Sequence, residues 1–146
     1  MRIDLKKKIL SVAVLPVLLL GIVTIVITLT QVKSSLISEV KDSLSGTAAT
    51  TLAAYNQHSG SYLRADNGDV WKGGYNISKS ESLLDNIKEE SGMDVTFFYG
   101  NERIMTSAKD GDGNRILGSP AGEIIVEKVL KGGENYFSSS VSLNGT

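Results

Sequence analysis

The first third of the chain begins with an unbroken apolar run. No charged residue occurs from Ile9 to Val32, and residues 9–29 in a helix with a rise of about 1.5 Å per residue would extend roughly 31 Å. A helix of that length crosses a bilayer. The run is longer than the apolar core of a cleaved signal peptide, and no small-residue A-x-A cleavage site follows it. We therefore predict an uncleaved transmembrane signal anchor over residues 9–32.

After the anchor, apolar residues recur every three to four positions with charged residues between them. They are Val32, Leu36, Val40, Leu44, Ala48, Leu52 and Tyr55. This pattern predicts a long amphipathic helix, a stalk over residues 33–58. The repeat is closer to four than to a heptad, so an ordinary left-handed coiled coil is not predicted over the whole stalk. We expect a packed or dimeric stalk, and hence a homodimer. Alternatively, the apolar stripe packs on the chain's own sheet. Both arrangements can hold for different turns of the same helix.

The next segments change from a loop pattern to a helix pattern. Residues 60–78 are rich in Gly, Asn, Asp and Ser, which predicts a loop. Three aromatic residues interrupt it: Tyr62, Trp71 and Tyr75. A short amphipathic helix is expected from Ser80, and Gly92 should end it.

The last segments combine strands with a second helix. Strand patterns cover residues 94–99, 102–108 and 135–143, and a helix is expected with Ser119 as N-cap and Pro120 as its first residue. Residues 144–146 read as a hairpin turn whose returning strand is missing. We therefore expect an incomplete sheet in a truncated chain.

Gly100-Asn101 predicts a two-residue turn that closes a hairpin and fixes its register. Phe98 then lies opposite Arg103, Phe97 opposite Ile104, and Thr96 opposite Met105. Residues at alternate positions share a face. The two predicted faces are Val95, Phe97, Tyr99, Ile104 and Thr106 for packing, and Asp94, Thr96, Phe98, Arg103, Met105 and Ser107 for a small-molecule site.

Arg103 is the main candidate for ligand binding, because its planar guanidinium matches a carboxylate. It suggests an anionic ligand, although an acidic side chain from further strands is an alternative partner. Thr96, Phe98 and Ser107 are candidates as its neighbours. Arg115, Trp71 and Tyr75 are further candidates, since cationic and aromatic residues in loops over a sheet often line pockets.

Charge decides the orientation predicted for the anchor. The first eight residues carry a net charge of about +3, whereas the whole chain carries −1. Because positive residues stay on the cytoplasmic side of a span, we expect residues 1–8 to form a cytoplasmic tail. Everything after Val32 should then lie in the periplasm or outside the cell.

The composition excludes several kinds of chemistry. The sequence has no cysteine and a single histidine, His58, so thiolate and histidine-cluster metal sites are excluded. Residues 110–121 open like a calcium-binding EF-hand loop, but the sixth and twelfth positions hold Arg115 and Ala121 instead of Gly and Glu. The part after the anchor is mildly acidic, which does not fit nucleic acid binding. We expect no catalytic residue, no metal, no cofactor and no nucleic acid partner, and therefore no enzyme.

Four segments stand out in order along the chain. They are WKGGYNIS at residues 71–78, SGMDVTFFYGNERIMTS at 91–107, GDGNRILGSPAGE at 111–123 and VLKGGENYF at 129–137. Together they resemble the single-Cache sensor domain of bacterial chemoreceptors, and the resemblance covers roughly residues 36–146. It implies an α+β fold, with the long membrane-proximal helix followed by a PAS-like antiparallel sheet over residues 59–146. It also implies a pocket for a small-molecule ligand outside the membrane.

In this family two further strands and a second membrane helix follow, then a HAMP relay and a cytoplasmic signalling module. The resemblance therefore implies the front end of a transmembrane chemoreceptor, a methyl-accepting chemotaxis protein. Chemotaxis signalling proteins would be partners only through a cytoplasmic part absent from this sequence. Histidine kinases and cyclic-dinucleotide enzymes carry the same domain, so a sensor region of either is an alternative. A stand-alone membrane-anchored binding protein is another.

Overall fold

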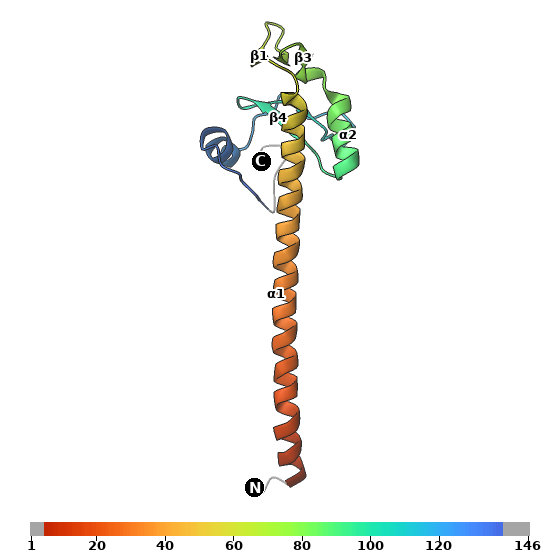
Figure 1. Cartoon of the computed structure of the whole chain (residues 1–146), viewed down its shortest axis with the longest axis vertical. Coiled ribbons are helices and arrows are strands. Elements are labelled where there is room, and N and C mark those ends of the chain that lie inside the picture. The colour runs from red at the N-terminus through yellow and green to blue at the C-terminus, as the bar shows by residue number, and fades with distance from the viewer. Residues whose placement is uncertain (1–4, 139–146) are drawn as a thin grey trace. The chain divides into compact units, whose positions relative to one another are not determined.

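The computed structural model describes residues 5–138. By their packing these residues divide between Asp42 and Ser43 into two units, residues 5–42 and residues 43–138. The elements are α1 (Leu5–Asn56), β1 (Tyr62–Arg64), β2 (Val70–Lys72), β3 (Tyr75–Asn76), the 3-10 turn η1 (Ile77–Lys79), α2 (Glu81–Ser91), β4 (Thr96–Tyr99), β5 (Glu102–Thr106), α3 (Glu123–Ile125) and the π-helix η2 (Val126–Lys131) (Figure 1). A long N-terminal helix followed by small antiparallel sheets is an α+β arrangement, as predicted.

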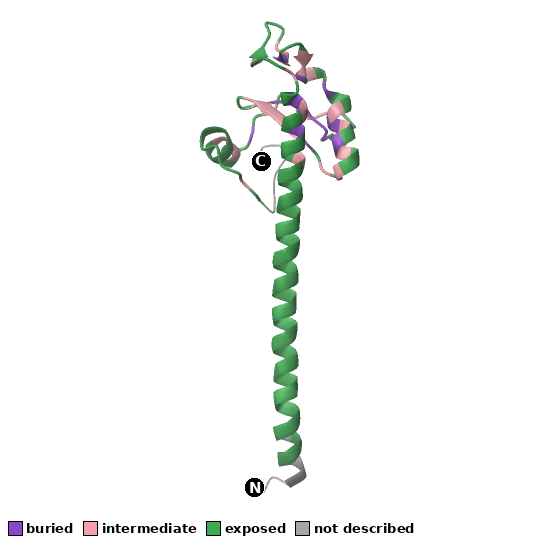
Figure 2. Cartoon of the chain, in the orientation of Figure 1, coloured by how far each residue is buried: buried purple, intermediate pink, exposed green. Residues whose placement is uncertain are grey.

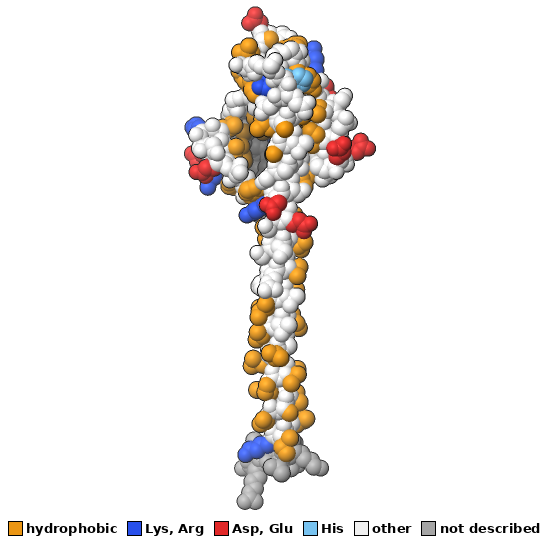
Figure 3. Space-filling view, in the orientation of Figure 1, with side chains coloured by type: hydrophobic (Ala, Val, Ile, Leu, Met, Phe, Trp, Pro, Cys, Tyr) orange, Lys and Arg blue, Asp and Glu red, His pale blue; other side chains and the backbone are white. Residues whose placement is uncertain are grey.

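The first unit is the N-terminal part of α1. Its apolar side chains are exposed along the helix, as Figures 2 and 3 show. The helix is long and apolar enough to cross a membrane. The hydroxyls of Thr24 and Thr30 donate to backbone carbonyls one turn earlier, those of Leu20 and Val26, at 2.8 and 3.0 Å. These bonds satisfy the polar groups internally, as an apolar environment requires.

In the second unit, the face that the last turns of α1 bury shares only Tyr55 with the predicted apolar stripe. Thr51 and Tyr55, one turn apart, are buried, whereas Leu44 and Leu52 are exposed. Only the last member of the stripe therefore packs on the chain's own sheets. The apolar residues before it remain on the helix surface (Figure 2).

Residues 60–78 form an antiparallel three-stranded sheet, β1-β2-β3, so the prediction of a loop is wrong. Val70 and Lys72 are buried and Trp71 between them is half-buried, which is the alternation of a strand with one covered face. Gly73 turns the chain between β2 and β3 with a φ of +55°. The Gly and Asp residues that suggested a loop form the turns between very short strands.

Helix α2 follows the prediction at both ends. Ser80 is its N-cap, and Gly92 ends it in the left-handed region with a φ of +70°. Leu84 and Ile87 face inward. They join one core with residues of α1, β2, η1 and the hairpin segment: Tyr55, Val70, Ile77, Val95, Ile104 and Met105.

The hairpin of β4 and β5 has the predicted turn but not the whole predicted register. Phe98 pairs with Arg103 as expected, but a bulge follows, and Phe97 lies opposite Met105 instead of Ile104. Thr96 consequently lies opposite Thr106 rather than Met105. A strictly alternating strand would place either Ile104 or Met105 on the polar face. The bulge lets both enter the core.

Residues 118–121 extend along the free edge of β5 instead of starting a helix. Arg103 donates its backbone N–H to the Ser119 carbonyl at 3.0 Å and accepts from the Gly118 N–H at 2.9 Å. Pro120 forms a bridge with Glu102. The helix begins only at Glu123, so the predicted start at Ser119 and Pro120 is wrong.

The predicted strand over residues 135–143 falls mostly outside the described residues. Residues 135–138 are described, and they form no strand. The expected turn at residues 144–146 also lies outside the described part of the chain.

Candidate functional site

Arg103 lies in the middle of β5 with its side chain covered. The residue is only 6% exposed, and its guanidinium carbon lies 5.6 Å from the centre of the Phe98 ring on β4. One guanidinium nitrogen, Nη1, lies 3.4 Å from the Ile116 carbonyl oxygen, to which it donates. Because pairing partners share a face, the predicted neighbourhood of Arg103 and Phe98 is present in the structure.

Two hydroxyls continue this face toward the far end of the hairpin. Thr96 and Thr106 are paired across the strands, and their Oγ1 atoms lie 2.8 Å apart. The bulge replaces the predicted Met105 with Thr106 at this position, so the face is more polar than the sequence suggested. We call the set Thr96, Phe98, Arg103 and Thr106 the Arg103 face.

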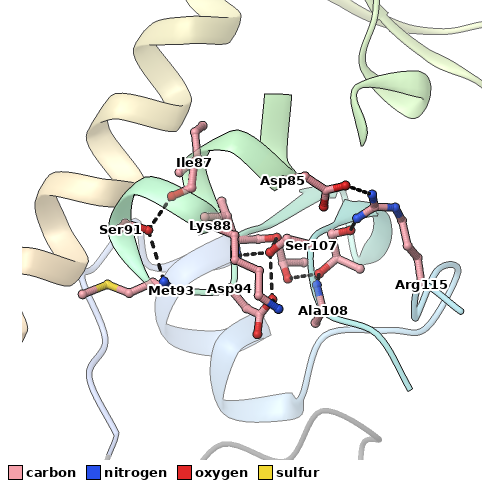
Figure 4. A network of polar contacts seen from close by, with 12 residues as sticks. Asp85, Ile87, Lys88, Ser91, Met93, Asp94, Ser107, Ala108 and Arg115 are labelled. Carbon is pink, nitrogen blue, oxygen red and sulfur yellow. Dashed lines mark hydrogen bonds and ion pairs between the residues drawn. The ribbon is translucent and has the colours of Figure 1, made fainter. Parts of the chain in front are cut away.

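Ser107 lies outside the Arg103 face. It is opposite Val95, because its N–H donates to the Val95 carbonyl at 2.9 Å and its Oγ accepts from the Val95 N–H at 2.8 Å. A shift of one residue moves a side chain to the other face of a strand. The Ser107 hydroxyl donates to Asp94 at 2.9 Å, and Asp94 pairs with Lys88 of α2 at 2.8 Å (Figure 4).

Arg115 joins three segments of the second unit. Its Nη1 donates to the Thr106 carbonyl at 2.7 Å, and its Nη2 pairs with Asp85 of α2 at 2.6 Å (Figure 4). The Arg115 hydrogen bond holds the pKa of the Asp85 carboxyl below its usual range. The guanidinium therefore connects α2 to the end of β5. A surface pocket of about 330 Å³ lies beside it, lined by Asp85, Lys88, Glu89, Ser107 and Lys109.

Trp71 and Tyr75 belong to the other sheet. Trp71 lies in β2, where it pairs with Leu63 on one side and Asn76 on the other. The ring of Tyr75 stacks on His58 with centres 4.2 Å apart and planes 9° from parallel. His58 is thus half-buried against an aromatic ring.

The acidic turn at residues 110–114 uses its first carboxylate for the backbone. Asp110 Oδ1 accepts from the N–H groups of Asp112 and Asn114 at 3.0 and 2.8 Å. An oxygen with two such donors is committed to the turn. Within residues 5–138, no group of three or more His, Cys, Asp or Glu side chains could hold a metal ion.

Sequence reasoning missed two buried polar contacts. Tyr55 is fully buried and its hydroxyl lies 2.7 Å from Ser80 Oγ, 25 residues further along the chain. Lys72 is buried as well, with its ammonium 3.0 Å from the Gly60 carbonyl and 4.2 Å from the centre of the Tyr62 ring. The alternation around Val70 could have indicated an inward Lys72. No local pattern indicates the contact of Tyr55.

Comparison with known families gives one match. Residues 75–146 match the family model of single cache domain 3. The chain carries a single-Cache sensor domain. The match includes β3, α2 and the whole hairpin that carries Arg103. Neither a curated protein nor a solved structure matches the chain.

The single-Cache domain defines the coarse function. Cache domains are extracellular sensors that bind small molecules, and they are not catalytic. In this chain the domain accompanies a helix that is long and apolar enough to be a membrane span.

Proposed function

We propose that this protein is the membrane-anchored front end of a transmembrane chemoreceptor, and that its Cache domain binds a small carboxylate on the Arg103 face. The observation that carries the ligand class is the covered guanidinium of Arg103 beside the Phe98 ring. A guanidinium presents a planar set of N–H donors that matches a carboxylate, and a low-dielectric setting strengthens such a contact.

The neighbours of Arg103 support the same class of ligand. The Phe98 ring offers an apolar wall, and Thr96 with Thr106 offers hydroxyl groups on the same face of the hairpin. A pocket with one charged group, an apolar wall and a few directed polar groups is the usual composition of a small-molecule site. We propose Arg103, Phe98 and Thr96 as ligand contacts. Ser107, Arg115, Trp71 and Tyr75 are not proposed as ligand contacts, because Ser107 lies off the Arg103 face, Arg115 bonds to Thr106 and Asp85, and the two aromatic residues belong to the other sheet.

Calorimetry on the full chain in detergent tests the binding, with acetate and succinate as probes. A charge-assisted contact contributes on the order of 1.5–3 kcal/mol, so Arg103→Ala should weaken binding roughly ten- to more than a hundredfold. Arg103→Lys should recover only part of this loss, because an ammonium lacks the planar fork. Arg64→Ala is the matched control, since Arg64 lies in the other sheet in an exposed ion pair with Glu102. Equal affinity in Arg103→Ala, or no binding of either probe, would reject the site.

The proposal places the N-terminus in the cytoplasm and the Cache domain outside, with residues 9–32 as the span. The lysines before the apolar run support this orientation. Alkaline phosphatase fused after Leu143 should be active, because that enzyme folds only outside the cytoplasm. Activity of a cytoplasmic reporter alone at the same position would contradict the orientation.

The proposal also includes a homodimer in which the stalk helices lie side by side. The exposed apolar residues of α1 support this, because an exposed row of such residues on one helix usually marks an interaction surface. Cysteines placed singly at Leu36, Val40 and Leu44 should form cross-links between chains, and positions between them should not. Uniform or absent cross-linking would contradict the dimer.

A further inference from the structure

Tyr55 is the place where α1 enters the core of the second unit. Its side chain is 0% exposed, whereas that of Leu52, almost one turn earlier, is 51% exposed. The edge of the Tyr55 ring contacts Phe97 of β4, with centres 5.2 Å apart and planes at 69°. Tyr75 of β3 lies on another side, with ring centres 6.2 Å apart. One α1 side chain therefore contacts both sheets.

The hydroxyl of Tyr55 extends these contacts to α2. It lies 2.7 Å from the Oγ of Ser80, the N-cap residue of α2. Ser80 has a single hydroxyl proton, which it donates to the Ile77 carbonyl at 2.6 Å. Tyr55 must therefore be the donor in its bond with Ser80. The result is a buried chain of donors that runs from α1 through Ser80 to the 3-10 turn before α2.

The same strand that contacts Tyr55 carries the ligand candidate Phe98. Successive side chains of a strand point to opposite faces, so Phe97 faces Tyr55 while Phe98 faces Arg103. The register shift of the hairpin lies between these two residues. Bulges bend and twist a strand locally. The backbone between these two residues therefore connects the Arg103 face directly to the contact with Tyr55.

We infer that Tyr55 couples the Arg103 face to α1 through its ring and to α2 through its hydroxyl. The inference rests on the proposed function, because it requires that the Arg103 face be occupied by an anion. Tyr55 acts as a positioning residue and does not touch the ligand. A carboxylate beside Arg103 would shift the backbone at position 98, and the Phe97–Tyr55 contact would pass this shift to residues 43–56 of α1.

The absence of cysteine from the sequence permits a test that needs no identified ligand. Phe98→Cys introduces a single thiol opposite Arg103. Iodoacetate alkylates it, with loss of iodide, and leaves a carboxylate beside the guanidinium, whereas iodoacetamide leaves a neutral group of nearly the same size. Hydrogen exchange, read by mass spectrometry on the full chain in detergent, then compares the two alkylated forms over residues 43–56, 81–91 and 96–106.

The carboxylate form should change exchange in all three segments relative to the neutral form, by roughly fivefold or more, the lower end of usual coupling between sites. Tyr55→Leu should abolish the response of residues 43–56 while residues 96–106 still respond. Tyr55→Phe keeps the ring but lacks the hydroxyl, so the response of residues 81–91 alone should fall at least about threefold. Leu52→Ala is the matched control on the exposed face of the same helix, and it should change nothing.

The outcomes separate the two proposals. If residues 96–106 respond equally to both alkylating reagents, the Arg103 face does not hold a carboxylate, and both proposals fail. A second case is that residues 96–106 respond but residues 43–56 do not. A third is that residues 43–56 respond as strongly in Tyr55→Leu as in the protein that keeps Tyr55. In either case only the role of Tyr55 is wrong. If Tyr55→Leu does not fold, Tyr55→Phe decides, and an undiminished response of residues 81–91 would overturn the coupling.

Discussion

Replacement of Arg115 by Ala should be among the most destabilising changes outside the apolar core. The side chain of Arg115 is 14% exposed and joins the Thr106 carbonyl to Asp85. Hydrogen bonds from a charged donor contribute about 1.5–3 kcal/mol when they are shielded from water. We expect this range for the hydrogen bond from Arg115 to the Thr106 carbonyl. The Asp85 side chain is 44% exposed, so its ion pair is screened and contributes only about 0.2–1 kcal/mol.

These values predict a loss of about 2–4 kcal/mol in the free energy of unfolding for Arg115→Ala. At 4–8 °C per kcal/mol for a domain of this size, the melting temperature should fall by about 10 °C or more. Asp85→Ala should lower it by only a few degrees. The Asp85→Ala/Arg115→Ala double variant should lose little more than Arg115→Ala alone, because Asp85 contributes mainly through Arg115.

The assay is thermal unfolding of the full chain in detergent, followed by the fluorescence of Trp71, the single tryptophan, which lies in the second unit. Arg64→Ala is the control, because Arg64 and Glu102 form an ion pair in which both side chains are exposed. If Asp85→Ala destabilises as much as Arg115→Ala, the screening argument is wrong. If Arg115→Ala is no worse than Arg64→Ala, the bond to the Thr106 carbonyl contributes nothing.

Three further predictions concern the second unit. Gly73→Ala should lower the free energy of unfolding by about 2 kcal/mol or more, because Gly73 has a positive φ and an added Cβ would overlap the Ser59 carbonyl. Gly74→Ala is the control. An added Cβ there meets open space, so the same thermal unfolding assay should show almost no change. Burial raises the pKa of Tyr55 to about 12. The stability that the neutral Tyr55 contributes should therefore be fully present below about pH 10, the pKa of the unfolded state, and should decline as the pH rises toward 12. In Tyr55→Phe the free energy of unfolding should fall less steeply with pH over this range, and an equally steep fall would contradict the prediction. The Arg115 hydrogen bond lowers the pKa of Asp85. The stability that the Asp85 carboxylate contributes should therefore be fully present above about pH 3.9, the pKa of the unfolded state, and should be lost as the pH falls through the lower pKa of the folded state. In urea titrations at pH 2–5, the free energy of unfolding of Arg115→Ala should lack this contribution to the loss of stability in acid.

The local features of the hairpin were predictable, but its bulge was not. Gly100-Asn101 indicated a two-residue turn, and the pairing of Phe98 with Arg103 close to it is as predicted. The register changes immediately after this pair, between Phe98 and Phe97, because Ile104 and Met105 both enter the core. Whether two neighbouring apolar residues share a core depends on what covers them. Here that cover comes from α1 and α2, which a pattern within the hairpin does not include.

The same limit explains the error at Ser119 and Pro120. Their order is favourable for starting a helix, but the backbone of residues 118–121 bonds to β5 instead. Proline suits that position because an edge segment need not donate at every residue. Residues 118–121 pair with β5 instead of starting a helix because the folded hairpin leaves the edge of β5 free for them. The candidate ligand contacts illustrate the same limit. The predicted pairing of Phe98 with Arg103, close to the turn, is present, whereas Ser107, which lies beyond the bulge, is on the other face of the strand from the one predicted.

The arrangement of the strands has a consequence for the order of folding. Each strand of β1-β2-β3 and of β4-β5 pairs with a neighbour in sequence, so both sheets close short loops and can form quickly. The bond between Tyr55 and Ser80 and the contact of Tyr55 with Phe97 span 25 residues and more. They require a helix that would already be held in the bilayer. The two sheets should therefore form first, and their docking on the end of α1 should be the slow, final step of maturation at the membrane surface.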